Sequence, residues 1–156
     1  MKKMIMLSLL CLWSTTVLAQ VEFGERYEQE HEWLNDSYLV VSNEEQGVLL
    51  VQADYDATSK KYPLYLKHLN TSLEKVWEDT ILIKQRFFIK GYHYSEKCTY
   101  LMLQNNQLNT LKVLRIDAIN QKVTEFESKE IAELQVTEFE VLKNTAVIGG
   151  YFEERP

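Results

Sequence analysis

Apolar residues occur in short runs along the chain from residue 37 onward, and these runs are rich in Val, Ile, Leu, Phe and Tyr. Such β-branched and aromatic side chains suit a pleated, half-buried surface, so the runs are typical of β-strands. The polar segments between them, such as NEEQ, NTSL and NNQLN, are short enough to be hairpin turns. The pattern therefore predicts an all-β, antiparallel fold. The predicted strands lie near residues 37–42, 47–53, 62–69, 75–83, 86–92, 99–105, 111–117, 122–128, 134–142 and 146–152.

Helix is the competing prediction in two segments only. Residues 22–34 carry Phe23 and Tyr27 near helical spacing, and residues 128–134 contain good helix formers. The second segment is too short to be a stable helix by itself. Neither segment changes the predicted fold class.

Three parts of the strand pattern recur in the same order. One match between hairpins could be coincidence, but three in one order indicate an internal repeat. In the longest match Asn70 aligns with Asp117, and both residue types begin turns because their short side chains hydrogen-bond the following backbone. The matched segments are 37–43 with 86–92, 47–52 with 99–104, and 64–79 with 111–126, at shifts of 49, 52 and 47 residues.

A further partial copy lies at the end of the sequence. AVIGGYFEERP (146–156) and FFIKGYHYSEK (87–97) both have three apolar residues, then Gly-Tyr at the fifth and sixth positions. We therefore expect AVIGGYF to be the first strand of a third unit, without a partner strand. The predicted β-repeat domain spans 37–156, with units at about 37–84 and 85–142 and the start of a third at 143–156.

A unit of about 50 residues with four short strands has the size of one β-propeller blade. LKVLRIDAINQKVTEFE (111–127) resembles the third and fourth strands of a blade in exported bacterial β-propeller-type repeat proteins, and the leader ending LAQ resembles those of the Bacteroidota. The resemblance implies an incomplete propeller of about two blades plus one strand. It is to a style of blade: Trp-Asp, kelch and Ser-x-Asp-x-Gly motifs are missing, so it assigns no functional residues.

Propellers close with about four to eight blades, so two units cannot complete a ring. Three arrangements stay open. The chain is the front piece of a longer propeller, or it pairs through its edge strands with other chains, or its two units form a small sandwich. The first arrangement is the preferred one.

The first 19 residues have the layout of a secretory signal peptide. Lys2 and Lys3 precede an apolar run, and small residues lead to a cleavage site expected between Ala19 and Gln20. The apolar run is too short and too interrupted for a membrane span. We expect an exported protein, periplasmic, cell-surface or secreted, with no membrane span after cleavage and an N-terminal arm at 20–36.

Charge and cysteine content limit the partners. The formal net charge is −6, and removing Lys2 and Lys3 with the leader lowers it to −8. Such a chain is a poor ligand for phosphate backbones, so nucleic acid is not an expected partner. Cys98 is the only thiol after the leader, so no internal disulfide can form. Cys98 is expected to be buried, or else to pair with another molecule.

Metal-binding motifs are incomplete in this sequence. Asp54 and Asp56 begin like a calcium loop, but Ser59 and Tyr65 stand where such a loop needs Gly and Glu. His93 and Cys98 flank a predicted turn, but two ligands do not make a tetrahedral zinc site. We therefore predict no metal and no cofactor.

Catalytic motifs are missing as well. The sequence has no G-x-S-x-G elbow, H-E-x-x-H pair or Gly-rich phosphate loop. Its carboxylates alternate with apolar residues along predicted strands, which indicates a solvated sheet face rather than an acid/base pair. These carboxylates are Glu125, Glu127, Glu138 and Glu140. No catalytic residue is predicted.

The densest aromatic and polar cluster is Tyr92, His93 and Tyr94, at the end of a predicted strand. Strand-end loops are common binding surfaces, so these three are the predicted binding residues. The preferred function is a non-catalytic, exported β-repeat module that binds a protein or a glycan. The alternative is the N-terminal portion of a larger propeller enzyme whose catalytic residues lie outside this sequence.

Overall fold

The computed structural model describes residues 26–28, 38–54, 58, 61–83, 86–105, 110–128, 134–143 and 145–152. The expected leader, with its cleavage site at Ala19 and Gln20, lies outside these residues, as does most of the expected arm at 20–36. The two segments with a competing helix prediction also lie largely outside them.

The described residues are all-β and antiparallel, which confirms the predicted fold class. The one helical segment among them is a 3-10 turn at Glu44–Gln46. The strands are β1 (Tyr38–Ser42), β2 (Val48–Ala53), β3 (Tyr62–Leu69), β4 (Lys75–Ile83), β5 (Phe88–Ser95), β6 (Cys98–Asn105), β7 (Thr110–Asp117), β8 (Lys122–Ser128), β9 (Leu134–Leu142) and β10 (Thr145–Phe152).

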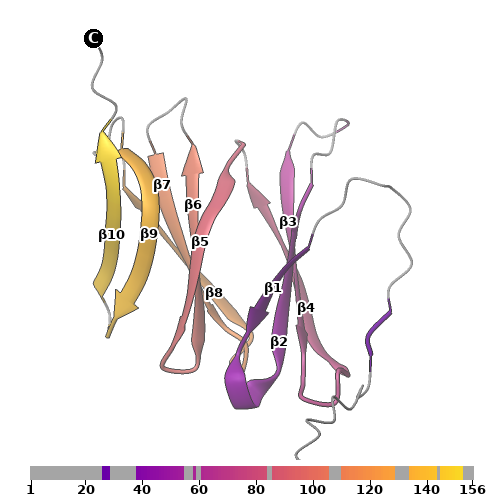
Figure 1. Ribbon diagram of the computed structural model, residues 1–156. Helices are drawn as coiled ribbons and strands as arrows, with labels where there is room; N and C mark the ends of the chain where they lie inside the picture. The colour runs from indigo at the N-terminus through magenta and orange to yellow at the C-terminus, as the bar shows by residue number, and fades with distance from the viewer. Residues whose placement is uncertain are drawn as a thin grey trace, which may run out of the picture.

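The ten strands form three separate sheets (Figure 1). The first sheet has the order β1-β2-β3-β4 and the second has the order β5-β6-β7-β8. The third consists of β9 and β10. Every strand pairs with its neighbour along the chain, as expected when short polar turns connect successive strands.

The three sheets pack in a stack, and the second sheet lies in the middle. Strand β6 shows this best, because all eight of its residues are buried. Leu101 and Leu103 belong to the core shared with the first sheet, whereas Met102 and Tyr100 belong to the core shared with the third. Successive side chains of a strand point to opposite faces, so an unbroken apolar run such as TYLML fits a strand covered on both sides.

The repeat is present in the structure as equivalent places within the two four-stranded sheets. The matched segments supply the first, second, third and fourth strands of each sheet in the same order. The turns agree as well: Asn70 Oδ1 accepts hydrogen bonds from the backbone N–H of Ser72 and Glu74, both 2.9 Å. Asp117 Oδ1 accepts one from the N–H of Asn120, 3.0 Å. The predicted turn role of Asn70 and Asp117 is confirmed.

The register of the repeat differs from the sequence match in the second strand. Leu66 and its equivalent Val113 each face the following sheet, and their cross-strand neighbours are Val51 and Met102. The structural shift between β2 and β6 is therefore 51 residues, not 52. A one-residue slip moves side chains to the opposite face, and apolar composition cannot reveal it in a strand that is buried on both faces.

The first strands are displaced further. Gly91 is the neighbour of Met102 and Leu39 is the neighbour of Val51, so β1 and β5 are related by a shift of 52 residues, not 49. A bulge between Ile89 and Gly91 adds to the displacement. The sequence match had aligned apolar residues that do not share a face.

The expectation for AVIGGYF is wrong. This segment lies in β10, which pairs along its whole length with β9, so it has a partner and is the second strand of its sheet. Residues 134–142, expected at the end of the second unit, form β9 and pair with no strand of the second sheet. The Gly-Tyr match misled because Gly91 sits in the first strand of its sheet, where β9 approaches it closely.

Candidate functional site

The predicted binding residues lie together on β5, but they do not share a face. Tyr92 pairs with Leu101, which faces the first sheet, whereas His93 pairs with Tyr100, which faces the third. Tyr92 is 48% exposed and His93 and Tyr94 are half-buried. Burial raises the pKa of Tyr94, with Glu44, Cys98 and Glu45 adding to the shift. Ligand binding by these three residues stays a prediction.

Cys98 is a buried free thiol, next to Ser95 across the β5–β6 hairpin. Among the described residues, no three His, Cys, Asp or Glu side chains are grouped so that they could hold a metal ion. Asp54 is described, but Asp56 and the rest of the calcium-like loop lie mostly outside the described residues.

The best-formed depression is a groove of about 590 Å³ across the outer face of the first sheet. This face points away from the second sheet. One row of direct cross-strand neighbours runs along the groove: Tyr38, Gln52, Tyr65 and Thr80. A second row consists of Leu50, Lys67 and Glu78. Neighbouring strands are about 4.8 Å apart, so the backbones that carry the two tyrosines are about 10 Å apart.

Polar side chains surround the two tyrosine rings of the groove. Lys67 Nζ donates a hydrogen bond to the hydroxyl of Tyr27, 3.1 Å, and lies 5.6 Å from the centroid of that ring. Tyr27 therefore lies at the groove, although it precedes the first strand. Glu78 forms an ion pair with Lys75 at 3.0 Å. Tyr65 is 41% exposed, so its ring is accessible from solvent.

The groove residues differ in chemistry from their equivalents in the second sheet. Gln52 stands where the second sheet has Leu103, and Lys67 stands where it has Leu114. Both leucines are buried against the first sheet. The outer face of the first sheet carries polar groups at positions that the repeat elsewhere uses for packing, as expected of a terminal face in contact with water.

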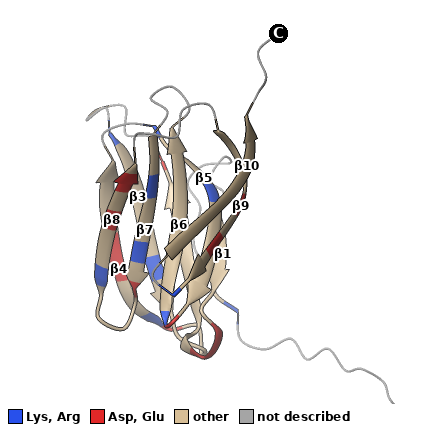
Figure 2. Ribbon diagram, turned by 90° about the vertical axis from the view of Figure 1, so that its left-hand side faces the viewer, with Lys and Arg blue, Asp and Glu red and all other residues tan. Residues whose placement is uncertain are grey.

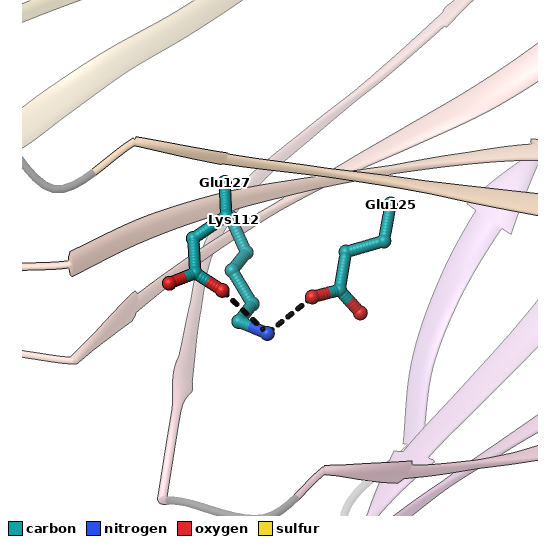
Figure 3. A network of polar contacts seen from close by, with 3 residues as sticks. All are labelled: Lys112, Glu125 and Glu127. Carbon is teal, nitrogen blue, oxygen red and sulfur yellow. Dashed lines mark hydrogen bonds and ion pairs between the residues drawn. The ribbon is translucent and has the colours of Figure 1, made fainter.

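A second polar cluster lies between the first two sheets, near their margin (Figure 3). Lys112 forms ion pairs with Glu125 and with Glu127, the latter at 3.1 Å. Its ammonium also lies 5.2 Å from the ring centroid of Phe87. Burial lowers the pKa of Lys112, but the hydrogen bonds and charges of both glutamates outweigh burial and raise it. A lysine held in its charged form between two carboxylates is suited to structure rather than to proton transfer.

The expectation of a solvated face is therefore wrong for part of the glutamate set. Glu125 and Glu127 turn toward Lys112, whose side chain is only 14% exposed. Glu138 and Glu140 are exposed, as expected, and alternate with the buried Phe139 and Val141. The signal for the cluster was a lysine inside the apolar run TLKVL, opposite a strand with two glutamates at alternate positions.

His68 is a buried polar residue that sequence reasoning did not place. It is 5% exposed and faces the second sheet, between Leu49 and Trp77 in its own sheet. Neither ring nitrogen has a hydrogen-bond partner among the described residues. Desolvation lowers the pKa of His68, and the nearby backbone of Gln46 opposes this shift only in part. The imidazole is uncharged at neutral pH and faces apolar neighbours.

Within the described residues, no helix is long and apolar enough to cross a membrane. No protein-family model, no curated protein and no solved structure matches this chain. The functional argument therefore depends on the surfaces described above.

Proposed function

We propose that this chain is a non-catalytic binding module of an exported, propeller-like β-repeat protein, and that the groove on the outer face of the first sheet binds a glycan. The propeller-like arrangement is supported by the stacking of two four-stranded meanders and a third sheet. Within this stack the first strands β1, β5 and β9 contact one another in turn. Export is supported by the leader in the sequence.

The observation that carries the proposal is the row of Tyr38, Gln52, Tyr65 and Thr80 across the sheet. Aromatic rings offer flat apolar faces to a sugar ring, and amide and hydroxyl groups between them can hydrogen-bond its hydroxyls. A protein ligand would favour a more continuous apolar patch, whereas this groove alternates rings with polar groups. A glycan is therefore the better supported of the two expected ligand classes.

The test is binding of the full chain to an array of purified polysaccharides and oligosaccharides, followed by titration of those that bind. Tyr65→Ala is expected to weaken binding about tenfold, a typical loss for a central aromatic contact. Gln52→Leu, which introduces the residue of the equivalent position in the second sheet, is expected to weaken it as well.

Tyr92→Ala is the matched control, because Tyr92 is an equally exposed tyrosine on another sheet. It is expected to leave glycan binding unchanged. The proposal fails if the chain binds no glycan. It also fails if Tyr92→Ala abolishes binding and Tyr65→Ala does not, which would favour the cluster at 92–94 instead.

A further inference from the structure

The third sheet has a free edge at β10. In the first two sheets the second strand pairs on both sides: β2 lies between β1 and β3, and β6 lies between β5 and β7. Strand β10 is the second strand of its sheet, yet among the described residues it pairs with β9 alone. Its other edge presents backbone N–H and C=O groups in the direction in which the other sheets continue.

This edge lacks the charges that protect the other outermost strands. Strand β4 carries Lys75, Glu78 and Asp79, and β8 carries Lys122, Glu125 and Glu127. Strand β10 reads TAVIGGYF, without a charged residue, and Figure 2 shows it tan along its length. Charged side chains on an edge strand oppose pairing with a further strand, so β10 is the edge best suited to strand addition.

The second sheet forms a floor beside this edge. In Figure 2 the β9–β10 hairpin lies in front of β6 and β5, whereas no described strand covers β7 and β8 to its left. Val113 on β7 packs against the core shared with the third sheet, and its cross-strand neighbour Phe126 on β8 is 55% exposed. The free edge of β10 and this floor of Val113 and Phe126 together form a step, the β10 ledge.

The interface between the first two sheets shows what covers an equivalent floor. Leu66, the equivalent of Val113, is fully buried there, as are Trp77 and Ile83 on the neighbouring β4. Leu114 and Ile116 of β7 supply the covering side chains. A third-position strand thus pairs with the edge of its own sheet and places alternate apolar residues on the preceding sheet.

We propose that the β10 ledge binds an extended strand of another polypeptide, antiparallel to β10, with apolar side chains at alternate positions on Val113 and Phe126. Main-chain hydrogen bonds to β10 supply affinity, and the floor selects strands with the correct alternation. This surface lies on the side of the stack opposite to the glycan groove, and the proposal does not depend on that groove.

A second copy of this chain does not fit through the same edge. Antiparallel pairing of two β10 strands requires a two-fold axis perpendicular to the shared sheet. That axis keeps both second sheets on one face, so β7 and β8 of each copy would cover the partner's third sheet, where the partner's own second sheet already lies. The occupant must therefore be a strand without such a layer.

The probe is a fluorescein-labelled peptide, TLKVLRID, which copies β7, the strand beside the equivalent β6. We expect a saturable rise in fluorescence anisotropy with the full chain, and slower hydrogen exchange of the amides at 145–152. A second peptide, TLKVPRID, is expected to bind at least about tenfold more weakly, because proline removes a main-chain donor and interrupts strand pairing.

Two matched variants test the floor. Phe126→Ser is expected to weaken binding of TLKVLRID about tenfold, because it removes an aromatic contact at the centre of the floor. Phe88→Ser alters an equally exposed phenylalanine on β5 of the same sheet and is expected to leave binding unchanged. Circular dichroism of both variants confirms that the sheets are intact.

The proposal is overturned if TLKVLRID does not bind, if TLKVPRID binds equally well, or if Phe126→Ser has no effect in a folded chain. Protection of amides in β4 or β8 instead of β10 would overturn it too. Sedimentation of the chain alone covers the remaining occupant: concentration-dependent dimers with protected 145–152 amides would assign the edge to a second copy.

Discussion

At the scale of single residues, the two turns show how far sequence reasoning reaches. Asn70 and Asp117 each accept hydrogen bonds from backbone N–H groups within four residues, as their residue types predict. Such interactions are local, so the sequence contains all the partners. The Asn120 amide and N–H hold the pKa of Asp117 below its ordinary value, which is consistent with the same turn geometry.

His68 is the residue with the clearest expected pH dependence. Burial lowers its pKa in the folded chain, whereas the unfolded chain has an ordinary histidine pKa of about 6.5. The unfolded state therefore binds the proton first, and the free energy of unfolding falls as the pH falls below about 6.5. The slope for one proton does not exceed about 1.4 kcal/mol per pH unit.

Urea unfolding between about pH 5.5 and 7.5 measures this effect. His68→Leu is expected to flatten the acid side of the profile, because the remaining side chain does not titrate and suits its apolar neighbours. His93→Gln removes another histidine and should leave the slope of the parent chain. An unchanged slope in His68→Leu would contradict the account of His68.

At the scale of elements, packing between sheets decides positions that local sequence leaves open. A Cβ at Gly91 would lie 3.1 Å from Cβ of Phe139, because β9 passes close to β5 there. Gly91→Val is therefore expected to lower the free energy of unfolding by about 1–3 kcal/mol, the usual cost of overpacking. Lys90→Val, at an exposed neighbouring position, is expected to have a much smaller effect.

A double-mutant cycle shows whether Phe139 is the cause. Phe139→Ala removes the ring and should cost about 3 kcal/mol by itself, because it opens a cavity in the core between the second and third sheets. The Gly91→Val and Phe139→Ala chain is expected to lose less than the sum of the two single losses. Strict additivity in chemical denaturation would show that β5 and β9 do not meet at this point.

The strands themselves were predictable from sequence, but their alignment between sheets was not. Alternating and β-branched runs marked all ten strands, since that information is local. The register of β6 against β2 was misjudged by one residue, because Leu101 and Met102 are both fully buried and either could face either neighbour. Only the packing of the third sheet on Met102 resolves this choice.

At the scale of the whole molecule, the candidate surfaces depend on how the sheets stack. The groove was not predictable, because Tyr38, Gln52 and Tyr65 come from three strands whose pairing register had to be known first. The β10 ledge was hidden for a similar reason: the sequence match assigned AVIGGYF to a first strand, and pairing with β9 makes it a second strand. Both surfaces lie at opposite ends of one stack.

The central claim is that the second sheet is covered on both faces, and thiol accessibility tests it most directly. In chains carrying Cys11→Ser, single cysteines are placed at Leu101, which faces the first sheet, and at Met102, which faces the third. The account predicts that both thiols, and the buried Cys98, react with a thiol reagent only on unfolding, whereas Phe126→Cys reacts at once. Immediate reaction of the Met102→Cys thiol in a folded chain with a protected Leu101→Cys thiol would show that the third sheet does not cover the second, and would contradict the account.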